Sequence, residues 1–160
     1  MPLPDQVLTR LREHGATVAT AESLTGGAVC AALVSVPGAS AVVRGGIVAY
    51  TAPMKARLLG VDPDVIAAAG LVSAQVAEAM ARGVRDATGA TLGIATTGAA
   101  GPEPHDNSPA GRVYVAVSGP SGEVSRRLDV PGDRAAVRAG AVDAALALVL
   151  ESLAGDVTLM

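Results

Sequence analysis

The sequence predicts an α/β layered domain built around a mixed sheet, and two observations support this fold class. Short apolar segments alternate with segments whose apolar residues recur at helical spacing, which is the pattern of strands joined by helices. Near the end of the chain, the alternating segments 113–117 and 124–130 flank turn-forming residues 118–122 and indicate an antiparallel hairpin. We therefore expect a mixed, mostly parallel sheet.

The first elements follow from apolar spacing and from the residues that end each segment. Residues 3–14 place their apolar side chains on one helical face, and Gly15 ends this helix. Residues 17–21 form a short apolar run rich in β-branched side chains, which predicts a buried strand. The next helix is expected over residues 28–36, because Pro37-Gly38 stops it.

The middle of the chain predicts one further strand and two short helices. Residues 42–50 are typical of a long strand, and Gly45-Gly46 within it indicates a bulge or a bend. Pro53 is well placed to begin a helix that runs to Leu59. A second short helix is expected over residues 62–70.

The second half contains the clearest amphipathic helix, over residues 73–88, with Ser73 as its N-cap. Residues 92–96 predict a second buried strand, and residues 103–110 an exposed loop without periodicity. After the hairpin, residues 133–153 predict a long closing helix.

Composition narrows the classes of function. The chain has 160 residues, and we expect a single domain over residues 1–160. Half of the residues are apolar and 17% are charged, which excludes a disordered chain. The net charge of −3, without a Lys/Arg block, argues against nucleic-acid and membrane-surface binding. No run could span a membrane and the N-terminus lacks a basic segment, so we expect a cytoplasmic protein. The single Cys30 excludes a disulfide framework and a cysteine-built metal site.

Candidate site residues follow the two early buried strands, each of which runs into a glycine-rich turn that carries hydroxyl groups. In open α/β sheets, ligands bind beyond the carboxyl ends of the strands. The residues expected along this rim are Ser23, Thr25, Gly26, Gly27, Thr97 and Gly98. Backbone N–H groups of the 25–27 turn, at a helix start, are suited to a phosphate or an oxyanion. The alternative is that Ser23 and Thr25 merely cap the helix.

A serine nucleophile needs a base, and Lys55 is the best candidate in the sequence. It is the single lysine among 12 basic residues, and a desolvated lysine can lose its proton near neutral pH. Tyr50 precedes it by a short turn and is expected to relay a proton or to orient the lysine. His14 is expected to be a polar helix end, and His105 a solvated loop residue, a lid residue or a weak metal ligand. No spacing of metal ligands indicates a dedicated metal site.

Several motifs occur in an order that resembles a known family. They are residues 21–27 (AESLTGG), 36–40 (VPGAS), 46–50 (GIVAY), Lys55, 58–61 (LLGV), 97–102 (TGAAGP) and 132–134 (GDR). Over nearly the whole chain they resemble the C-terminal domain of the competence/damage-inducible protein CinA, the nicotinamide-nucleotide amidohydrolase family. We expect this chain to lack the additional N-terminal domain of full-length CinA proteins.

The resemblance implies a three-layer α/β/α sandwich and the deamidation of nicotinamide mononucleotide to nicotinate mononucleotide and ammonia. The partner is then a small-molecule nucleotide, and the expected mechanism needs no metal and no organic cofactor. The residues that match the family's motifs are the nucleophile Ser23, the pair Tyr50 and Lys55, Thr97, and Arg134, which is suited to the nucleotide phosphate.

The sequence departs from the family's pattern at two places. Ser108 stands where the loop usually has a lysine, and Val130-Pro131 replaces an aromatic residue expected to stack on the pyridine ring. We therefore expect altered activity or specificity. Two alternatives stay open: a non-catalytic nucleotide- or phosphate-binding module, and an amidase for another small amide. The Ala/Val-rich, slightly acidic composition favours a homo-oligomer, with a dimer as the first expectation.

Overall fold

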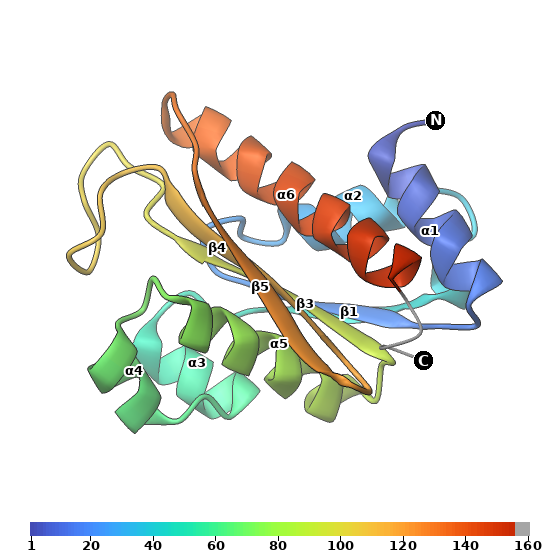
Figure 1. Ribbon diagram of the computed structural model, residues 1–160, viewed down its shortest axis with the longest axis horizontal. Coiled ribbons are helices and arrows are strands. Elements are labelled where there is room, and N and C mark those ends of the chain that lie inside the picture. The colour runs from blue at the N-terminus through green and yellow to red at the C-terminus, as the bar shows by residue number, and fades with distance from the viewer. Residues whose placement is uncertain (156–160) are drawn as a thin grey trace.

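The computed structural model describes residues 1–155, and the last five residues of the predicted domain, 156–160, lie outside the described part. Within residues 1–155, a five-stranded sheet lies between two layers of helices (Figure 1). The strands are β1 (Val18–Glu22), β2 (Val43–Val48), β3 (Leu92–Gly98), β4 (Arg112–Gly119) and β5 (Gly122–Asp129). The helices are α1 (Leu3–Glu13), α2 (Ala28–Val34), α3 (Ala52–Leu59), α4 (Pro63–Ala69), α5 (Ala74–Thr88) and α6 (Arg134–Ala154), with a short 3₁₀ helix over Ala39–Ala41.

The order of the strands in the sheet is β2-β1-β3-β4-β5. β1 pairs in parallel with β2 and with β3, whereas the β3–β4 and β4–β5 pairs are antiparallel. β5 therefore points in the same direction as β1, β2 and β3, and the predicted mixed, mostly parallel sheet is confirmed. The carboxyl ends of three neighbouring parallel strands meet at one edge, where ligands bind in open α/β sheets.

Helices α1, α2 and α6 cover one face of the sheet, and α3, α4 and α5 cover the other (Figure 1). The described residues form two apolar clusters, one on each side of the sheet. This arrangement confirms the three-layer α/β/α sandwich that the resemblance implied.

The two faces of the sheet differ in the size of their side chains. Residues of the sheet that face α1, α2 and α6 include Val18, Leu92, Ile94, Val113, Val115 and Val117. Those that face α5 include Ala19, Ala21, Ala95 and Ala116. A Cβ at Gly93 would lie 2.0 Å from the Ala81 carbonyl oxygen, so α5 lies directly on the backbone of β3. A Cβ at Gly83 would lie 1.9 Å from the Leu59 carbonyl oxygen, which brings α3 equally close to α5.

The sequence-based elements agree with the structure except at their ends. The predicted 42–50 strand is shorter, because β2 ends at Val48 and the chain then turns into α3. The bulge predicted beside Gly45-Gly46 is confirmed. Val18 pairs with Val43 and the next residue, Ala19, pairs with Gly45, so Arg44 is an additional residue of β2 without a partner in β1. Ser73 caps α5 as predicted, its hydroxyl accepting a hydrogen bond from the Val76 amide.

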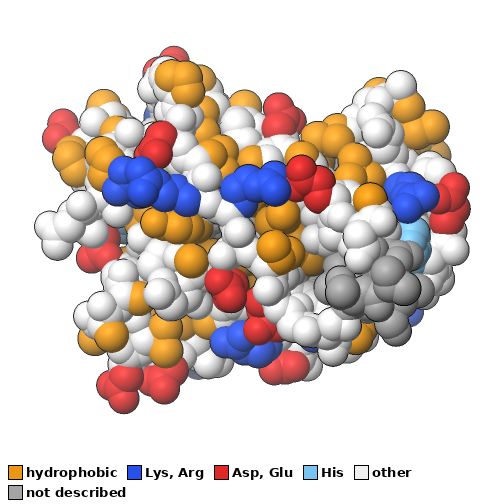
Figure 2. Space-filling view, viewed as in Figure 1, with side chains coloured by type: hydrophobic (Ala, Val, Ile, Leu, Met, Phe, Trp, Pro, Cys, Tyr) orange, Lys and Arg blue, Asp and Glu red, His pale blue; other side chains and the backbone are white. Residues whose placement is uncertain are grey.

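The outer surface in view carries acidic and basic side chains that are interspersed and not gathered by sign (Figure 2). Two ion pairs of the described residues are Arg82 with Glu123 and Arg126 with Glu151. Across residues 1–155, none of the helices combines the length and the apolar character that crossing a membrane requires.

Candidate active site

The site lies where the turns that follow β1 and β2 and the end of β3 meet. The Ser23 amide donates a hydrogen bond of 3.1 Å to the Thr96 carbonyl oxygen, which ties the turn after β1 to β3. The Ala49 amide donates a bond of 2.9 Å to the Glu22 carbonyl oxygen, which ties the segment after β2 to β1. Of the residues predicted along this rim, Ser23 and Gly98 line a cavity beside the strand ends. The others do not line it: Thr25, Gly26, Gly27 and Thr97.

The central contact joins Ser23 to Lys55, whose side chain enters the site from α3. The distance from Lys55 Nζ to Ser23 Oγ is 2.9 Å. Lys55 Nζ also donates to the carbonyl oxygens of Ala49, at 2.9 Å, and Tyr50, at 3.3 Å. Ser23 is 8% exposed and Lys55 is 1% exposed, so water has little access to this pair. The chain's sole lysine and the predicted nucleophile are thus hydrogen-bonded, as the base hypothesis requires.

Burial changes the acid–base chemistry of Lys55. Desolvation disfavours the charged ammonium and lowers the pKa of Lys55 from 10.5 to about 8. A neutral amine has two N–H groups and one lone pair. The carbonyl oxygens of Ala49 and Tyr50 can accept from the two N–H groups, which leaves the lone pair for the Ser23 hydroxyl proton.

Tyr50 acts on Lys55 through its backbone and on Arg134 through its side chain. Its hydroxyl accepts a hydrogen bond of 3.0 Å from Arg134 Nη2, while its carbonyl oxygen contacts Lys55. Arg134 Nη1 donates to the Gly101 carbonyl oxygen at 2.7 Å. Among the described contacts, no hydrogen bond joins the Tyr50 side chain to Lys55, so the predicted relay is absent. The Tyr50 hydroxyl instead holds the guanidinium of Arg134, the first residue of α6.

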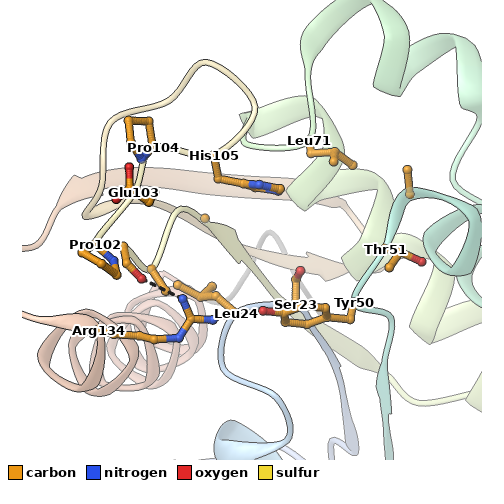
Figure 3. A pocket seen from close by; sticks show the side chains of 14 residues that line it. Ser23, Leu24, Tyr50, Thr51, Leu71, Pro102, Glu103, Pro104, His105 and Arg134 are labelled. Carbon is orange, nitrogen blue, oxygen red and sulfur yellow. Dashed lines mark hydrogen bonds between the residues drawn. The ribbon is translucent and has the colours of Figure 1, made fainter.

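The cavity beside Ser23 has a volume of about 480 Å³ and lies between the turns and the loop that precedes β4 (Figure 3). Ser23, Tyr50 and Arg134 all line this cavity, and the Tyr50 side chain extends from the neighbourhood of Ser23 toward Arg134, which it contacts. Glu103 and His105 line it from the loop that the sequence predicted to be exposed. His105 is exposed, as expected of a solvated loop residue, and it also borders the cavity. A volume between about 300 and 1,000 Å³ is usual for a small-molecule site.

Thr97 lies behind the cavity wall and does not line the cavity. It is 2% exposed, and its hydroxyl donates a hydrogen bond of 2.8 Å to the Leu71 carbonyl oxygen. The Leu71 amide donates to the Asp106 carboxylate from the opposite loop. Leu71 lines the cavity, so these two bonds fix one segment of its wall. Thr97 was predicted to be catalytic, and the structure gives its hydroxyl this supporting contact instead.

The glycine turn uses some of the amides that were expected to face an oxyanion. The Gly26 amide donates to the Ser23 carbonyl oxygen at 3.0 Å, and the Gly27 amide donates to Glu22 Oε1 at 3.2 Å. Among the described residues, the amides of Leu24 and Thr25 donate to no protein acceptor. Leu24 lines the cavity, whereas Thr25 is fully buried and does not line it, so the donor left for an oxyanion is the Leu24 amide. The alternative that Ser23 and Thr25 cap α2 is wrong, because the N-cap is Gly27 and lacks a side-chain bond.

Two residues that hold this turn were not identified from the sequence. Glu22 accepts hydrogen bonds from the turn and from the start of α2. Arg138, from α6, donates to the carbonyl oxygens of Leu24, at 2.9 Å, and Thr25, at 3.1 Å. A charged residue at the end of a buried strand was the signal for Glu22. No local signal pointed to Arg138, since it lies more than a hundred residues from the turn it contacts.

The departures from the family's pattern have different structural settings. Ser108 is 9% exposed, and its backbone exchanges two hydrogen bonds with His105, so it closes the 105–108 turn. Val130 packs against the apolar cluster under α6 and does not line the cavity.

His14 Nδ1 lies 2.8 Å from the Arg10 carbonyl oxygen at the end of α1, as expected of a polar helix end. Among residues 1–155, no group of three or more His, Cys, Asp or Glu could hold a metal ion.

Comparison with known proteins gives consistent matches. The family model described as "CinA C-terminal domain" matches residues 1–153. A "CinA-like protein" of Frankia casuarinae is 51% identical over 93% of this chain and 34% of its own length. A "putative competence-damage inducible protein" of Desulforamulus reducens is 48% identical over 91% of this chain and 35% of its own length. The chain thus spans about a third of the length of these curated relatives.

Solved structures are similar over nearly the whole chain. A CinA superfamily protein from Klebsiella pneumoniae superposes with a TM-score of 0.92, is 34% identical, and matches over 96% of both chains. A competence/damage-inducible protein from Agrobacterium tumefaciens superposes with a TM-score of 0.89 and is 34% identical over 95% of this chain and 93% of its own. The family match over residues 1–153 includes every element that builds the site.

Proposed function

The chain belongs to the CinA C-terminal domain family, and we propose that it is an amidohydrolase that converts nicotinamide mononucleotide to nicotinate mononucleotide and ammonia. The observation that carries this proposal is the contact of 2.9 Å between the buried Lys55 amine and the Ser23 hydroxyl. A pKa of about 8 leaves part of Lys55 neutral at physiological pH, and a neutral amine can act as a base.

In the proposed reaction, Lys55 takes the Ser23 proton as Oγ forms a bond to the carboxamide carbon of the substrate. The developing oxyanion accepts a hydrogen bond from the free amide of Leu24, a donor of a type worth about 2.7–4 kcal/mol. The Lys55 ammonium returns the proton to the leaving nitrogen, and ammonia departs. Water then gives a proton to Lys55 and bonds to the acyl carbon, and the bond from that carbon to Ser23 Oγ breaks. The Lys55 ammonium returns the proton to Oγ, and the product acid loses its own proton to solvent and leaves as the carboxylate.

Substrate binding is assigned to the remaining walls of the cavity. Arg134 presents a guanidinium to the cavity, and its geometry suits a nucleotide phosphate. Its bonds to Gly101 and Tyr50 hold that guanidinium in place before substrate enters. A phosphate held there and a carboxamide at Ser23 define the two ends of the ligand.

An ammonia-release assay on nicotinamide mononucleotide, with purified protein, tests this proposal. Ser23→Ala is expected to abolish release because no other hydroxyl contacts Lys55 in the described residues. Lys55→Arg keeps the positive charge but cannot give up a proton, so it should lose turnover as well. Release undiminished by Ser23→Ala would contradict the proposed nucleophile.

The same variants separate the enzyme from a nucleotide-binding module. A binder without catalysis would release no ammonia, while its affinity for the nucleotide, measured by calorimetry, would be the same with Lys55→Arg. Faster release from another small amide than from nicotinamide mononucleotide would instead identify an amidase of different specificity.

A further inference from the structure

The buried carboxylate of Glu22 caps α2 from the end of the preceding strand. Glu22 is 1% exposed, and it accepts hydrogen bonds from the amides of Val29, at 2.8 Å, and Cys30, at 3.0 Å. These amides belong to the second and third residues of α2, which an N-cap side chain normally satisfies. The N-cap position itself holds Gly27, which has no side chain, and its amide also donates to Glu22.

This arrangement leaves the Ser23 hydroxyl available to Lys55. Serine is a preferred helix cap, and a serine that caps must point its oxygen at backbone amides. Here Glu22 satisfies those amides, and Ser23 Oγ instead lies 2.9 Å from Lys55 Nζ. We propose that Glu22 is the positioning residue of the nucleophile: by capping α2 it holds the 23–27 turn in the form that presents Ser23 to Lys55. This inference rests on the proposed function.

The hydrogen bonds to Glu22 require both of its oxygens. Besides the three amides, the hydroxyls of Thr20, at 3.2 Å, and Thr25, at 2.6 Å, donate to this carboxylate. Five donors therefore point at the two oxygens of this side chain. Backbone amides donate to each of the two oxygens. In either orientation of its side-chain amide, a glutamine at this position would therefore place its NH₂ group against at least one backbone N–H. A buried amide without an acceptor is unfavourable, so the turn would shift to reach another partner.

Glu22→Gln tests the inference, because it preserves the shape of the side chain and removes one acceptor. We expect kcat for nicotinamide mononucleotide to fall about 10- to 100-fold, since small misplacement of reacting groups has effects of this size. KM is expected to change less than about 3-fold, because Glu22 does not line the cavity where the substrate binds. The assay is run well below the melting temperature of the variant, which is measured in parallel.

Asp62→Ala is the control for a lost helix cap, since Asp62 caps α4 through its carboxylate and does not line the cavity. It is expected to lower the melting temperature, because alanine cannot cap, and to leave kcat unchanged. Equal losses of kcat in Glu22→Gln and Asp62→Ala would overturn the inference, because they would reflect general stability. If Glu22→Gln does not fold, Glu22→Asp is assayed in its place: its shorter side chain draws the carboxylate back from the amides of α2, and an unchanged kcat would then overturn the inference.

A second readout separates this inference from the proposed substrate. The rate at which a small sulfonyl fluoride labels Ser23, followed by intact mass, reports how well Lys55 activates the hydroxyl. It should fall by the same factor as kcat in Glu22→Gln. Absence of ammonia release by the wild-type protein would refute the proposed function alone, and the labelling rates would then decide the role of Glu22. An unchanged labelling rate in folded Glu22→Gln, or no labelling of the wild type, would overturn that role.

Discussion

The pH dependence of turnover provides the most direct test of Lys55 as the base. Burial lowers its pKa to about 8, so the neutral fraction should be about 9% at pH 7 and about 91% at pH 9. Because only the neutral amine can take the Ser23 proton, kcat/KM is expected to rise about 10-fold between these values and then level off. An exposed lysine with a pKa of 10.5 would be neutral in only about 0.03% of molecules at pH 7.

The measurement is initial ammonia release from nicotinamide mononucleotide at limiting concentration, from pH 6.5 to 9.5, with enzyme-free blanks subtracted at each pH. Circular dichroism at the same pH values verifies that the protein stays folded. A rate that is flat from pH 7 to 9 would show that the titrating base is not Lys55. A rate that still rises tenfold per pH unit at pH 9.5 would refute the lowered pKa.

Other consequences can be checked independently. Since the folded pKa of Lys55 lies below its unfolded value, the unfolded state binds more protons between about pH 8 and 10.5, and stability rises with pH there by up to about 3 kcal/mol. Lys55→Met should remove this rise, as followed by urea unfolding at pH 7.5 and 10. Arg134→Ala should raise KM about 10- to 100-fold and change kcat little, since a bond to a charged phosphate is worth about 1.5–3 kcal/mol. Asp106→Ala frees the Leu71 amide and should raise KM more than it lowers kcat in steady-state kinetics. Ser73→Ala removes the cap of α5 and should reduce the free energy of unfolding by about 1 kcal/mol without changing turnover.

Much of the site was predictable because its residues lie next to strong local signals. Ser23 follows a buried strand and precedes two glycines with positive φ, Gly26 and Gly27. Lys55 stood out because the sequence has no other lysine. These positions follow from the rule that parallel strands present their carboxyl ends at one edge, which needs only the order of elements. The distance between the two side chains still required the structure.

Three contacts could not have been inferred from sequence, because they join residues far apart in the chain. The Tyr50 hydroxyl meets Arg134 across 84 positions, and Arg138 meets Leu24 across 114. Thr97 lies in a motif that predicted a catalytic residue, yet its hydroxyl lies behind the cavity wall and donates to the Leu71 carbonyl oxygen. Spacing indicates which residues share an edge of the sheet, but not the direction in which each side chain finally points.

Apolar periodicity, capping residues and glycine positions by themselves determined the elements and the layered α/β fold, because these signals act within a few residues along the chain. Tertiary structure alone decided which groups became partners and how far each was removed from water. The lowered pKa of Lys55 illustrates this division, since desolvation depends on everything packed around the amine and on no single neighbour in sequence.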